Sequence, residues 1–339
     1  MRSIIALSTT LLALGCGGDS TSRTSTASTV STTSKSTTTA LKVGMLPKLD
    51  IPYFQACRQG AEEACKELGY TFDYNAAPQL SADEQESRVR HWIAQKYDVI
   101  LIAPNDPESI APVLAKAKRE GIVVVTYDAD ANPERSGRAA FVNQASTQGI
   151  AEGLVDVLAE QMGKKGKALI VSSTPTAPNQ NAWMAVMKPY LKKKYPDIEL
   201  LQDLMPGEDQ NLCRAQTRQV IGATPDLKGI VGLTSKALPG AAEAVKQAGK
   251  SGTIAVTGLG LPSEVKEHVN DGAVKKFLLW SPIDLGYLAV HTAKAARDGS
   301  LKDGSFTFGR LKNIAIKNTE VLLGPPMEFT KDNISSATF

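Results

Sequence analysis

Polar side chains recur at points where a short apolar run of the chain ends. Lys48 follows the run that begins at residue 42, and Asp128 follows the run at 122–127. Six further positions of this kind carry amides, hydroxyls or an indole: Asn105, Asn179, Gln180, Thr234, Ser235 and Trp280. Asp and Asn favour turns, and Ser and Thr cap helices, so each position alone has an ordinary structural explanation. Their repetition favours a binding site for a polar ligand of little or no charge.

The residue types indicate what kind of ligand such a site would hold. Hydroxyl groups both donate and accept hydrogen bonds, so Asp, Asn and Gln are natural partners, with Lys as a charge-assisted donor. Aromatic rings pack well on the apolar face of a sugar ring, and four of them stand beside the polar positions: Tyr53, Phe54, Trp183 and Trp280. Aromatic residues are only 6% of the chain, so this placement is informative. Trp183 falls inside a predicted helix, where a place in the core is the alternative.

Apolar runs of strand length alternate with amphipathic helix patterns along nearly the whole chain from residue 41. In the first half, the predicted strands cover residues 42–45, 71–74, 99–103 and 122–127. In the second half, they cover residues 168–172, 199–203, 229–233, 253–258 and 273–279. Alternating strands and helices predict parallel sheets that helices cover on both faces. We therefore expect an α/β fold of two doubly wound parallel-sheet lobes, with ligands at the carboxyl ends of the strands, in a cleft between the lobes.

The first 40 residues have a different composition. Arg2 precedes an apolar run that is too short to span a bilayer and ends in the sequence LALGC at 12–16. This pattern resembles a bacterial lipoprotein signal, which implies that residues 1–15 are removed and Cys16 carries the lipid. An ordinary secretory signal cut near Ala13 is the alternative. The Ser/Thr-rich residues 16–40 predict a disordered linker, because they contain almost no large apolar side chains. We expect an exported protein at the outer face of the cytoplasmic membrane or in the periplasm, attached by the lipid anchor only.

Composition argues against several other classes of protein. The formal net charge is +3 with scattered Lys and Arg, so nothing suggests a nucleic-acid partner. The three histidines do not have the spacing of metal ligands, and we expect no metal site. Cys57 and Cys65 lie eight residues apart on one predicted helix, too far for a disulfide.

Enzyme signatures are incomplete. The sequence GLG at 258–260 follows a predicted strand, but Ser263 stands where a dinucleotide-binding motif needs its third glycine. A hydrolase would need a nucleophile elbow with a partner histidine, and neither is visible. A transcription regulator would carry a helix-turn-helix before the first strand, where this chain has its signal and linker. We expect a binding protein that performs no chemistry and needs no cofactor.

Several sequence segments are recognisable together. GMLPK at 44–48 and YDAD at 127–130 resemble the periplasmic binding proteins of the ribose-binding type. The match narrows to the branch that contains the L-rhamnose-binding and autoinducer-2-binding components of ABC importers. The segments that narrow it are NQNAW at 179–183, VTGLG at 256–260, LWSPIDLGY at 279–287 and VLLGPP at 321–326. The stretch from residue 306 to residue 334 looks more like the rhamnose proteins.

The autoinducer-2 binders of this branch imply a set of site residues. Their Lys and Asp match Lys48 and Asp128, and their Asp-Gln pair falls on residues 179–180, where the first is Asn. Their Pro and Ala on the next strand end fall on Leu233 and Ser235. Three of six positions therefore differ, which argues against autoinducer-2, because losing a carboxylate that accepts from diol hydroxyls leaves the ligand under-satisfied.

The wider ribose-type family implies further positions. Its aromatic pair matches residues 53–54, a strand-end Asn matches Thr234, and the polar residue before the second crossing between lobes matches Trp280. The family's Arg after the aspartate is Ala129 here, so the charged clamp of ribose-type sites is absent.

The resemblance also implies how the chain divides and what it does. Three crossings between lobes fall near Gln144, Pro282 and Thr307. The N-terminal lobe then contains residues 41–144 and 283–305, and the C-terminal lobe contains residues 145–282 and 306–339. The implied function is hinge closure on a monosaccharide, with L-rhamnose or a similar deoxy-sugar as the leading ligand, by a monomer that delivers it to ABC importer permease subunits. The alternatives are an autoinducer-2-binding protein of the same family and a sugar-sensing subunit for a chemoreceptor or sensor kinase.

Overall fold

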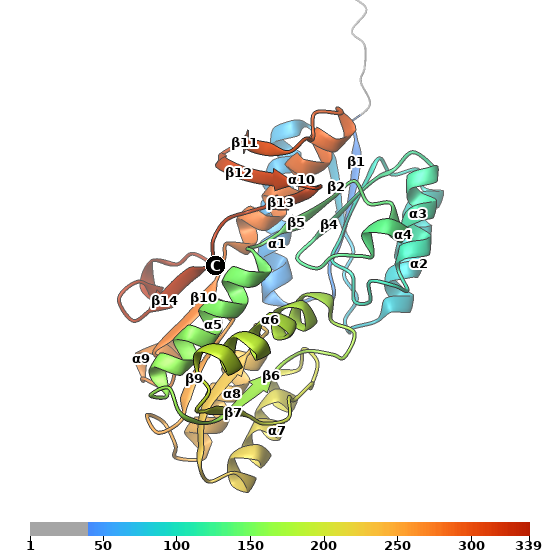
Figure 1. Cartoon of the computed structure of the whole chain (residues 1–339). Coiled ribbons are helices and arrows are strands. Elements are labelled where there is room, and N and C mark those ends of the chain that lie inside the picture. The colour runs from blue at the N-terminus through green and yellow to red at the C-terminus, as the bar shows by residue number, and fades with distance from the viewer. Residues whose placement is uncertain (1–39) are drawn as a thin grey trace, which may run out of the picture. The chain divides into compact units, whose positions relative to one another are not determined.

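A computed structural model describes residues 40–339 (Figure 1). The predicted signal, Cys16 and the predicted linker up to residue 39 lie outside the described residues. Two sheets with cores of parallel strands and helices on both faces make up most of the described part, which confirms the predicted α/β fold of two doubly wound lobes.

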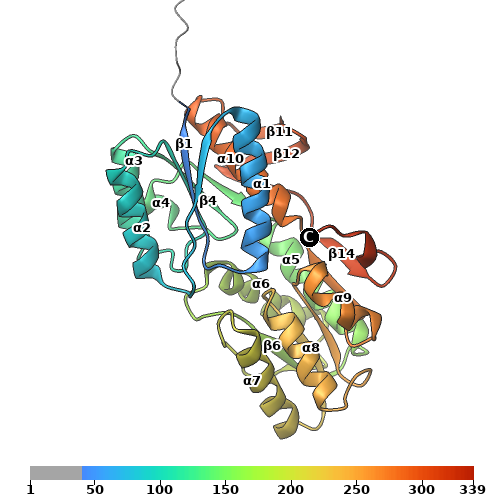
Figure 2. The ribbon, with the colours of Figure 1, turned by 180° about the vertical axis from the view of Figure 1, so that it is seen from behind.

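The first sheet is built on five parallel strands in the order β2-β1-β3-β4-β5. Its strands are β1 (Lys42–Leu46), β2 (Thr71–Tyr74), β3 (Val99–Ile102), β4 (Val123–Tyr127) and β5 (Ala140–Asn143). The connecting helices are α1 (Pro52–Leu68), α2 (Ala82–Ala94), α3 (Ala111–Arg119) and the short α4 (Pro133–Ser136). Helix α1 covers one face and α2 and α3 cover the other (Figures 1 and 2), because the chain reverses its direction across the sheet after β2.

Local sequence explains where these helices begin and end. Pro52 occupies the first turn of α1, where a missing N–H costs nothing, and Gly69 ends the helix in the left-handed conformation. Ser81 caps α2, and its hydroxyl accepts a hydrogen bond from the Glu84 backbone N at 3.2 Å.

The second sheet repeats this arrangement with the strand order β7-β6-β8-β9. Its strands are β6 (Gly166–Val171), β7 (Ile198–Leu200), β8 (Leu227–Gly232) and β9 (Ala255–Gly258). The helices are α5 (Thr147–Gln161), α6 (Pro178–Lys194), α7 (Gln210–Ala223), α8 (Ala237–Gln247) and α9 (Pro262–Asn270). Strand β10 (Lys276–Leu279) adjoins this sheet through a bridge between Leu259 and Leu278, and it pairs antiparallel with β14 (Met327–Thr330). A short 3-10 helix, Ile334–Ser336, follows.

The C-terminal strands correct the predicted division of the chain. Strands β11 (Gly304–Phe308), β12 (Leu311–Lys317) and β13 (Glu320–Leu322) extend the first sheet, where β13 pairs in parallel with β5. Assigning all of residues 306–339 to the second lobe was therefore wrong, and only β14 pairs there. The third crossing lies between β13 and β14, not near Thr307. The physical reason is the free edge of β5, a strand that the sequence analysis did not predict.

Helix α10 (Pro282–Arg297) returns to the first sheet and packs against α1 (Figure 2). Glycines make this approach possible, because a Cβ at Gly286 would lie 1.8 Å from the Cys57 carbonyl oxygen. A Cβ at Gly60 would lie 1.7 Å from the Ile283 carbonyl oxygen. We call the eight-stranded sheet with α1–α4 and α10 the first lobe, and the remaining elements the second lobe.

Among residues 40–339, no helix combines the length and the apolar character that crossing a bilayer requires. The same residues contain no group of three or more His, Cys, Asp or Glu side chains placed to hold a metal ion.

Candidate ligand-binding site

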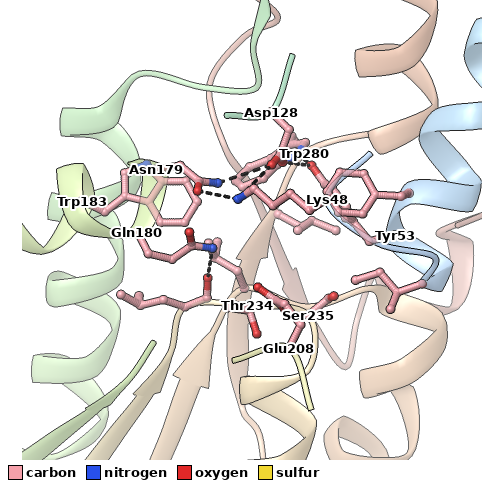
Figure 3. Close-up of a pocket in the computed structure, with 15 residues that line it drawn as sticks. Lys48, Tyr53, Asp128, Asn179, Gln180, Trp183, Glu208, Thr234, Ser235 and Trp280 are labelled. Atoms are coloured by element: carbon pink, nitrogen blue, oxygen red, sulfur yellow. Dashed lines mark hydrogen bonds and ion pairs between the residues drawn. The ribbon is translucent and has the colours of Figure 1, made fainter. Parts of the chain in front are cut away.

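A cavity with about 390 Å³ of empty space, counted to its opening, lies at the carboxyl ends of strands from both lobes. Nine of the ten predicted ligand-binding residues line it (Figure 3): Lys48, Tyr53, Phe54, Asp128, Asn179, Gln180, Thr234, Ser235 and Trp280. The fold thus brings together residues as distant in the chain as Lys48 and Trp280.

Lys48, Asp128 and Asn179 form a charged and polar group across the cavity. The Lys48 ammonium donates to Asn179 Oδ1 at 2.7 Å and lies 3.5 Å from Asp128 Oδ2. Asn179 Nδ2 donates to Asp128 Oδ2 at 3.5 Å. Lys48 and Asp128 are each 4% exposed, so the pair is withdrawn from water. Because Asn179 belongs to α6 of the second lobe, these hydrogen bonds join the two lobes directly.

Asp128 holds an unusual backbone conformation at the end of β4. Its φ is 62°, and the Ala129 backbone N donates to the Tyr127 carbonyl oxygen at 2.6 Å. This closes a three-residue γ-turn, a strained conformation for a residue with a Cβ. The turn ends the strand abruptly and leaves the Asp128 carboxylate inside the cavity, where Tyr53 OH donates to Oδ1 at 2.8 Å.

Aromatic rings make the apolar side of the cavity. Trp280 follows β10, and its Nε1 donates to Tyr53 OH at 2.7 Å. The Tyr53 and Trp280 rings meet edge to face with centroids 6.4 Å apart, and Trp183 lies 6.1 Å from Trp280. Trp183, for which a core position was the alternative, is both buried and part of the lining. Phe54 packs against Tyr53 at 5.1 Å.

The second lobe supplies amide and hydroxyl groups. Gln180 Nε2 donates to the Leu233 carbonyl oxygen at 3.4 Å, whereas Gln180 Oε1 is buried without a hydrogen-bond partner. Such an atom costs free energy unless a donor reaches it. The Thr234 hydroxyl accepts from the backbone N of Ala237 at 3.0 Å, which orders the turn into α8. Ser235 follows it and is 8% exposed.

Asn105 is the predicted site residue that does not line the cavity. Its Nδ2 donates to the Lys48 carbonyl oxygen at 3.1 Å, and its backbone N donates to Gln85 Oε1 at 2.8 Å. Gln85, which is fully buried, also donates to the carbonyl oxygens of Pro47 and Ala103. Asn105 therefore supports the loop that carries Lys48, one layer behind the cavity wall.

Sequence reasoning missed four lining residues: Ile51, Glu208, Leu259 and Leu279. A leucine or isoleucine beside a strand end has the same signal as any core residue. Glu208 lies in an irregular segment between β7 and α7, away from the predicted strand ends. Its only signal was a Pro-Gly turn at residues 206–207 before a helix.

Burial dominates the acid–base properties of the cavity. It raises the pKa of Asp128, while the Lys48 ammonium and the hydrogen bond from Tyr53 oppose the rise. It also raises the pKa of Glu208, against the Lys48 charge and the hydroxyls of Ser173 and Thr234. The pKa of Tyr53 lies well above its usual value, first through burial and then through the Asp128 charge.

Comparisons with known proteins agree with this architecture. Residues 43–301 match the family model described as periplasmic binding protein domain. An ABC transporter solute-binding protein from Clostridium phytofermentas, solved with bound L-rhamnose, is 29% identical with a TM-score of 0.82, over 88% of this chain and 98% of that one. The LsrB protein from Clostridium saccharobutylicum, solved with AI-2, has the same fold at 23% identity, with a TM-score of 0.82 over 88% of this chain and all of that one.

A curated relative gives the same result from sequence alone. The D-allose-binding periplasmic protein of Escherichia coli K12 is 24% identical over 251 residues, which are 71% of this chain and 79% of that protein. The family match covers more than half of the chain, and the two solved structures share its fold with TM-scores of 0.82. The chain belongs to the type 1 periplasmic binding proteins.

Proposed function

We propose that this chain is the solute-binding component of an ABC sugar importer, and that it binds a monosaccharide in the cavity by closure of the two lobes. L-rhamnose or a similar deoxy-sugar is the leading ligand. The observation that carries the proposal is the composition of the cavity, where hydrogen-bonding side chains from both lobes face aromatic rings. The relatives and structural neighbours named for D-allose and L-rhamnose support the sugar class.

The lining suits a sugar that has both hydroxyl groups and an apolar part. Lys48 donates, Asp128 accepts, and the amides of Asn179 and Gln180 do both. The buried Oε1 of Gln180 gains its missing partner when a ligand hydroxyl donates to it. About half of the lining is aliphatic or aromatic, which favours a ligand with a methyl group over a fully hydroxylated one.

Closure follows from where the contacts lie. Lys48 and Asp128 come from the first lobe, and Asn179 and Gln180 come from the second, so a sugar in the cavity touches both lobes at once. A ligand that binds the closed arrangement better than the open one shifts the population toward it. The direct Lys48–Asn179 hydrogen bond shows that the lobes are close enough to be bridged.

Autoinducer-2 is the second candidate, because Lys48, Asp128 and Gln180 match the binders of that signal and the LsrB structure has the same fold. Asn179 argues against it. Its Oδ1 already accepts from Lys48, and its Nδ2 donates to Asp128, so it does not provide the second carboxylate. A sensing role would use the same cavity, and neighbouring permease and ATPase genes would favour import.

A thermal-shift panel tests the proposed ligand class. We expect one deoxy-hexose among the common monosaccharides to raise the unfolding temperature of the purified protein, and autoinducer-2 to give no comparable rise. Stabilisation by autoinducer-2 alone would reverse this ranking. A complete panel without a stabilising sugar would contradict the proposal.

The pH dependence of binding gives a further prediction. Because burial raises the pKa of Asp128, this carboxylate takes up its proton at a higher pH than the ordinary value of 3.8. A protonated carboxyl is a weaker acceptor, so we expect sugar affinity to fall during acidification while the pH is still above that value. The unliganded protein should behave oppositely. Its native state holds the Asp128 proton more tightly than the unfolded chain, so this group lowers the free energy of unfolding as the pH rises through the same window.

Titration calorimetry and urea unfolding over this pH range measure the two effects. The titratable groups whose charges or hydrogen bonds act on Asp128 or respond to it are Lys48, Tyr53, Cys57, Tyr127 and Glu208. An affinity that stays constant down to pH 3.8 would contradict the assignment of Asp128 as an acceptor.

The first 40 residues support export and lipid attachment at Cys16 as part of the same proposal. A tethered, monomeric binding protein would stay close to its permease and remain free to present either lobe to it.

A further inference from the structure

Glu208 is a carboxylate in the cavity that no sequence signal assigned. It reaches the cavity from the segment between β7 and α7, beside Thr234 (Figure 3). The backbone of this segment is tied to the end of β6, because Gly207 N donates to the Ser173 carbonyl oxygen at 3.1 Å and Ser172 N donates to the Leu204 carbonyl oxygen at 2.8 Å. Glu208 is therefore held at the cavity by ordered backbone.

The lysines near the cavity have other partners. Lys48 donates to Asn179 and lies against Asp128. Lys236 forms an ion pair with Glu264 at 2.5 Å. Glu208 thus gives the cavity a second carboxylate, which is not matched by a second lysine among its lining residues.

Glu208 also lines a second, more open cavity with about 1070 Å³ of empty space, together with Leu49 and Leu80 of the first lobe and Lys236 of the second. A Cβ on Gly207 would lie 3.9 Å from Leu80 Cδ1, so the lobes approach each other closely beside Glu208. Glu208 therefore lies where the two cavities meet.

We propose that Glu208 accepts a hydrogen bond from a hydroxyl group of the bound sugar and makes the site select neutral sugars over acidic ones such as uronates. This inference rests on the proposed function, and it deepens that function by naming the charge class of the ligand. A sugar carboxylate would meet Asp128 and Glu208 with only Lys48 as a cation, in surroundings where water screens charge poorly. Repulsion of the wrong ligand is a common source of specificity.

Burial supports this role. It raises the pKa of Glu208 even though the Ser173 and Thr234 hydroxyls and the Lys48 charge oppose the rise. A sugar hydroxyl would give this buried carboxylate a further hydrogen-bond donor.

Calorimetric titration of the full chain tests the proposal. The probes are L-rhamnose, or the neutral monosaccharide that stabilises best in the thermal panel, and D-glucuronate and D-galacturonate. We expect the unaltered protein to bind the neutral sugar and neither uronate. Glu208→Gln should lower the affinity for the neutral sugar by about ten- to hundredfold, because a hydrogen bond to a charged acceptor contributes about 1.5–3 kcal/mol.

Asp209→Asn is the matched control. It removes the same charge one residue away, outside the inner cavity, and an asparagine can still cap α7 as Asp209 does through the Leu212 backbone N. We expect it to change the affinity by no more than about twofold. Should Glu208→Gln fail to fold, Glu208→Asp keeps the charge, withdraws the acceptor by one methylene and should weaken binding as well.

The outcomes separate failure of this inference from failure of the proposed function. If the unaltered protein binds a neutral sugar and Glu208→Gln binds it equally well, the role of Glu208 is overturned while the proposed function stands. Binding of a uronate as tight as that of the neutral sugar overturns the charge selection. A chain that binds no sugar overturns the proposed function and this inference with it.

Discussion

Asp128→Asn is expected to abolish most of the stabilisation that the sugar gives. A ligand at one hundred times its dissociation constant stabilises a protein by about 2.7 kcal/mol. Loss of a charged acceptor that takes one or two hydroxyl donors weakens binding by about a hundredfold, which reduces that stabilisation to about 0.4 kcal/mol. The shift in unfolding temperature with and without sugar measures the change.

Asparagine is the right replacement because of the backbone at this position. Asp128 has a φ of 62° inside a γ-turn, and Asn tolerates positive φ far better than Ala does. The substitution therefore removes the charge and leaves the turn, and Lys48 keeps Asn179 Oδ1 as an acceptor. Asp50→Asn is the control, since Asp50 is an exposed carboxylate on the same loop as Lys48. If the Asp128→Asn protein keeps the full sugar-induced shift in unfolding temperature, the sugar does not depend on this carboxylate and the site lies elsewhere.

Gly286→Ala is expected to have the largest effect on the stability of the unliganded protein. The added methyl would lie 1.8 Å from the backbone oxygen of Cys57, and no rotamer change can relieve a contact with backbone. Helices α1 and α10 must then separate, at a cost of about 3 kcal/mol or more, the upper end for overpacked sites. Gly60→Ala should act in the same way through Ile283. Because α1 carries Tyr53 and Phe54, sugar affinity should fall as well.

Gly222→Ala is expected to stabilise the protein, in contrast to Gly286→Ala. Gly222 is exposed in α7, and a Cβ there meets no atom within 4 Å. Alanine should stabilise this helix by about 0.5–1 kcal/mol through its better helix propensity. Urea unfolding of the three glycine variants checks the ordering. Equal midpoints for Gly286→Ala and the unaltered protein would show that α1 and α10 do not need their close approach.

Much of the fold could be predicted because its signals are local. Hydrophobic runs and helix caps depend on neighbours a few residues apart, so strands such as β3 and helices such as α2 could be read from the chain. Strand β5 has only four residues, and the tail strands pair with partners far away in sequence. Local pattern does not encode which sheet edge is free, and the C-terminal strands were assigned to the wrong lobe for that reason.

The candidate site also divides into residues with a local sequence signal and residues placed by distant contacts. Residues at strand ends could be predicted because parallel strands share one edge, and nine of ten came together there. Asn105 also follows a strand, yet its side chain points to the Lys48 backbone, a difference of orientation that sequence does not give. Glu208 lies in a segment without regular secondary structure. Backbone hydrogen bonds between residues 204–207 and the end of β6 bring it to the cavity.

By itself, the sequence determined that this chain forms two parallel α/β lobes of the periplasmic binding protein type, with polar and aromatic residues at the strand ends. Only the tertiary structure decided the lobe of the tail strands, the supporting role of Asn105, the strained turn at Asp128 and the presence of Glu208 in the cavity. The physical reason is the range of the interactions. Caps and hydrophobic periodicity act within a few residues, whereas sheet edges, helix approach and burial of charge depend on groups that meet only after folding.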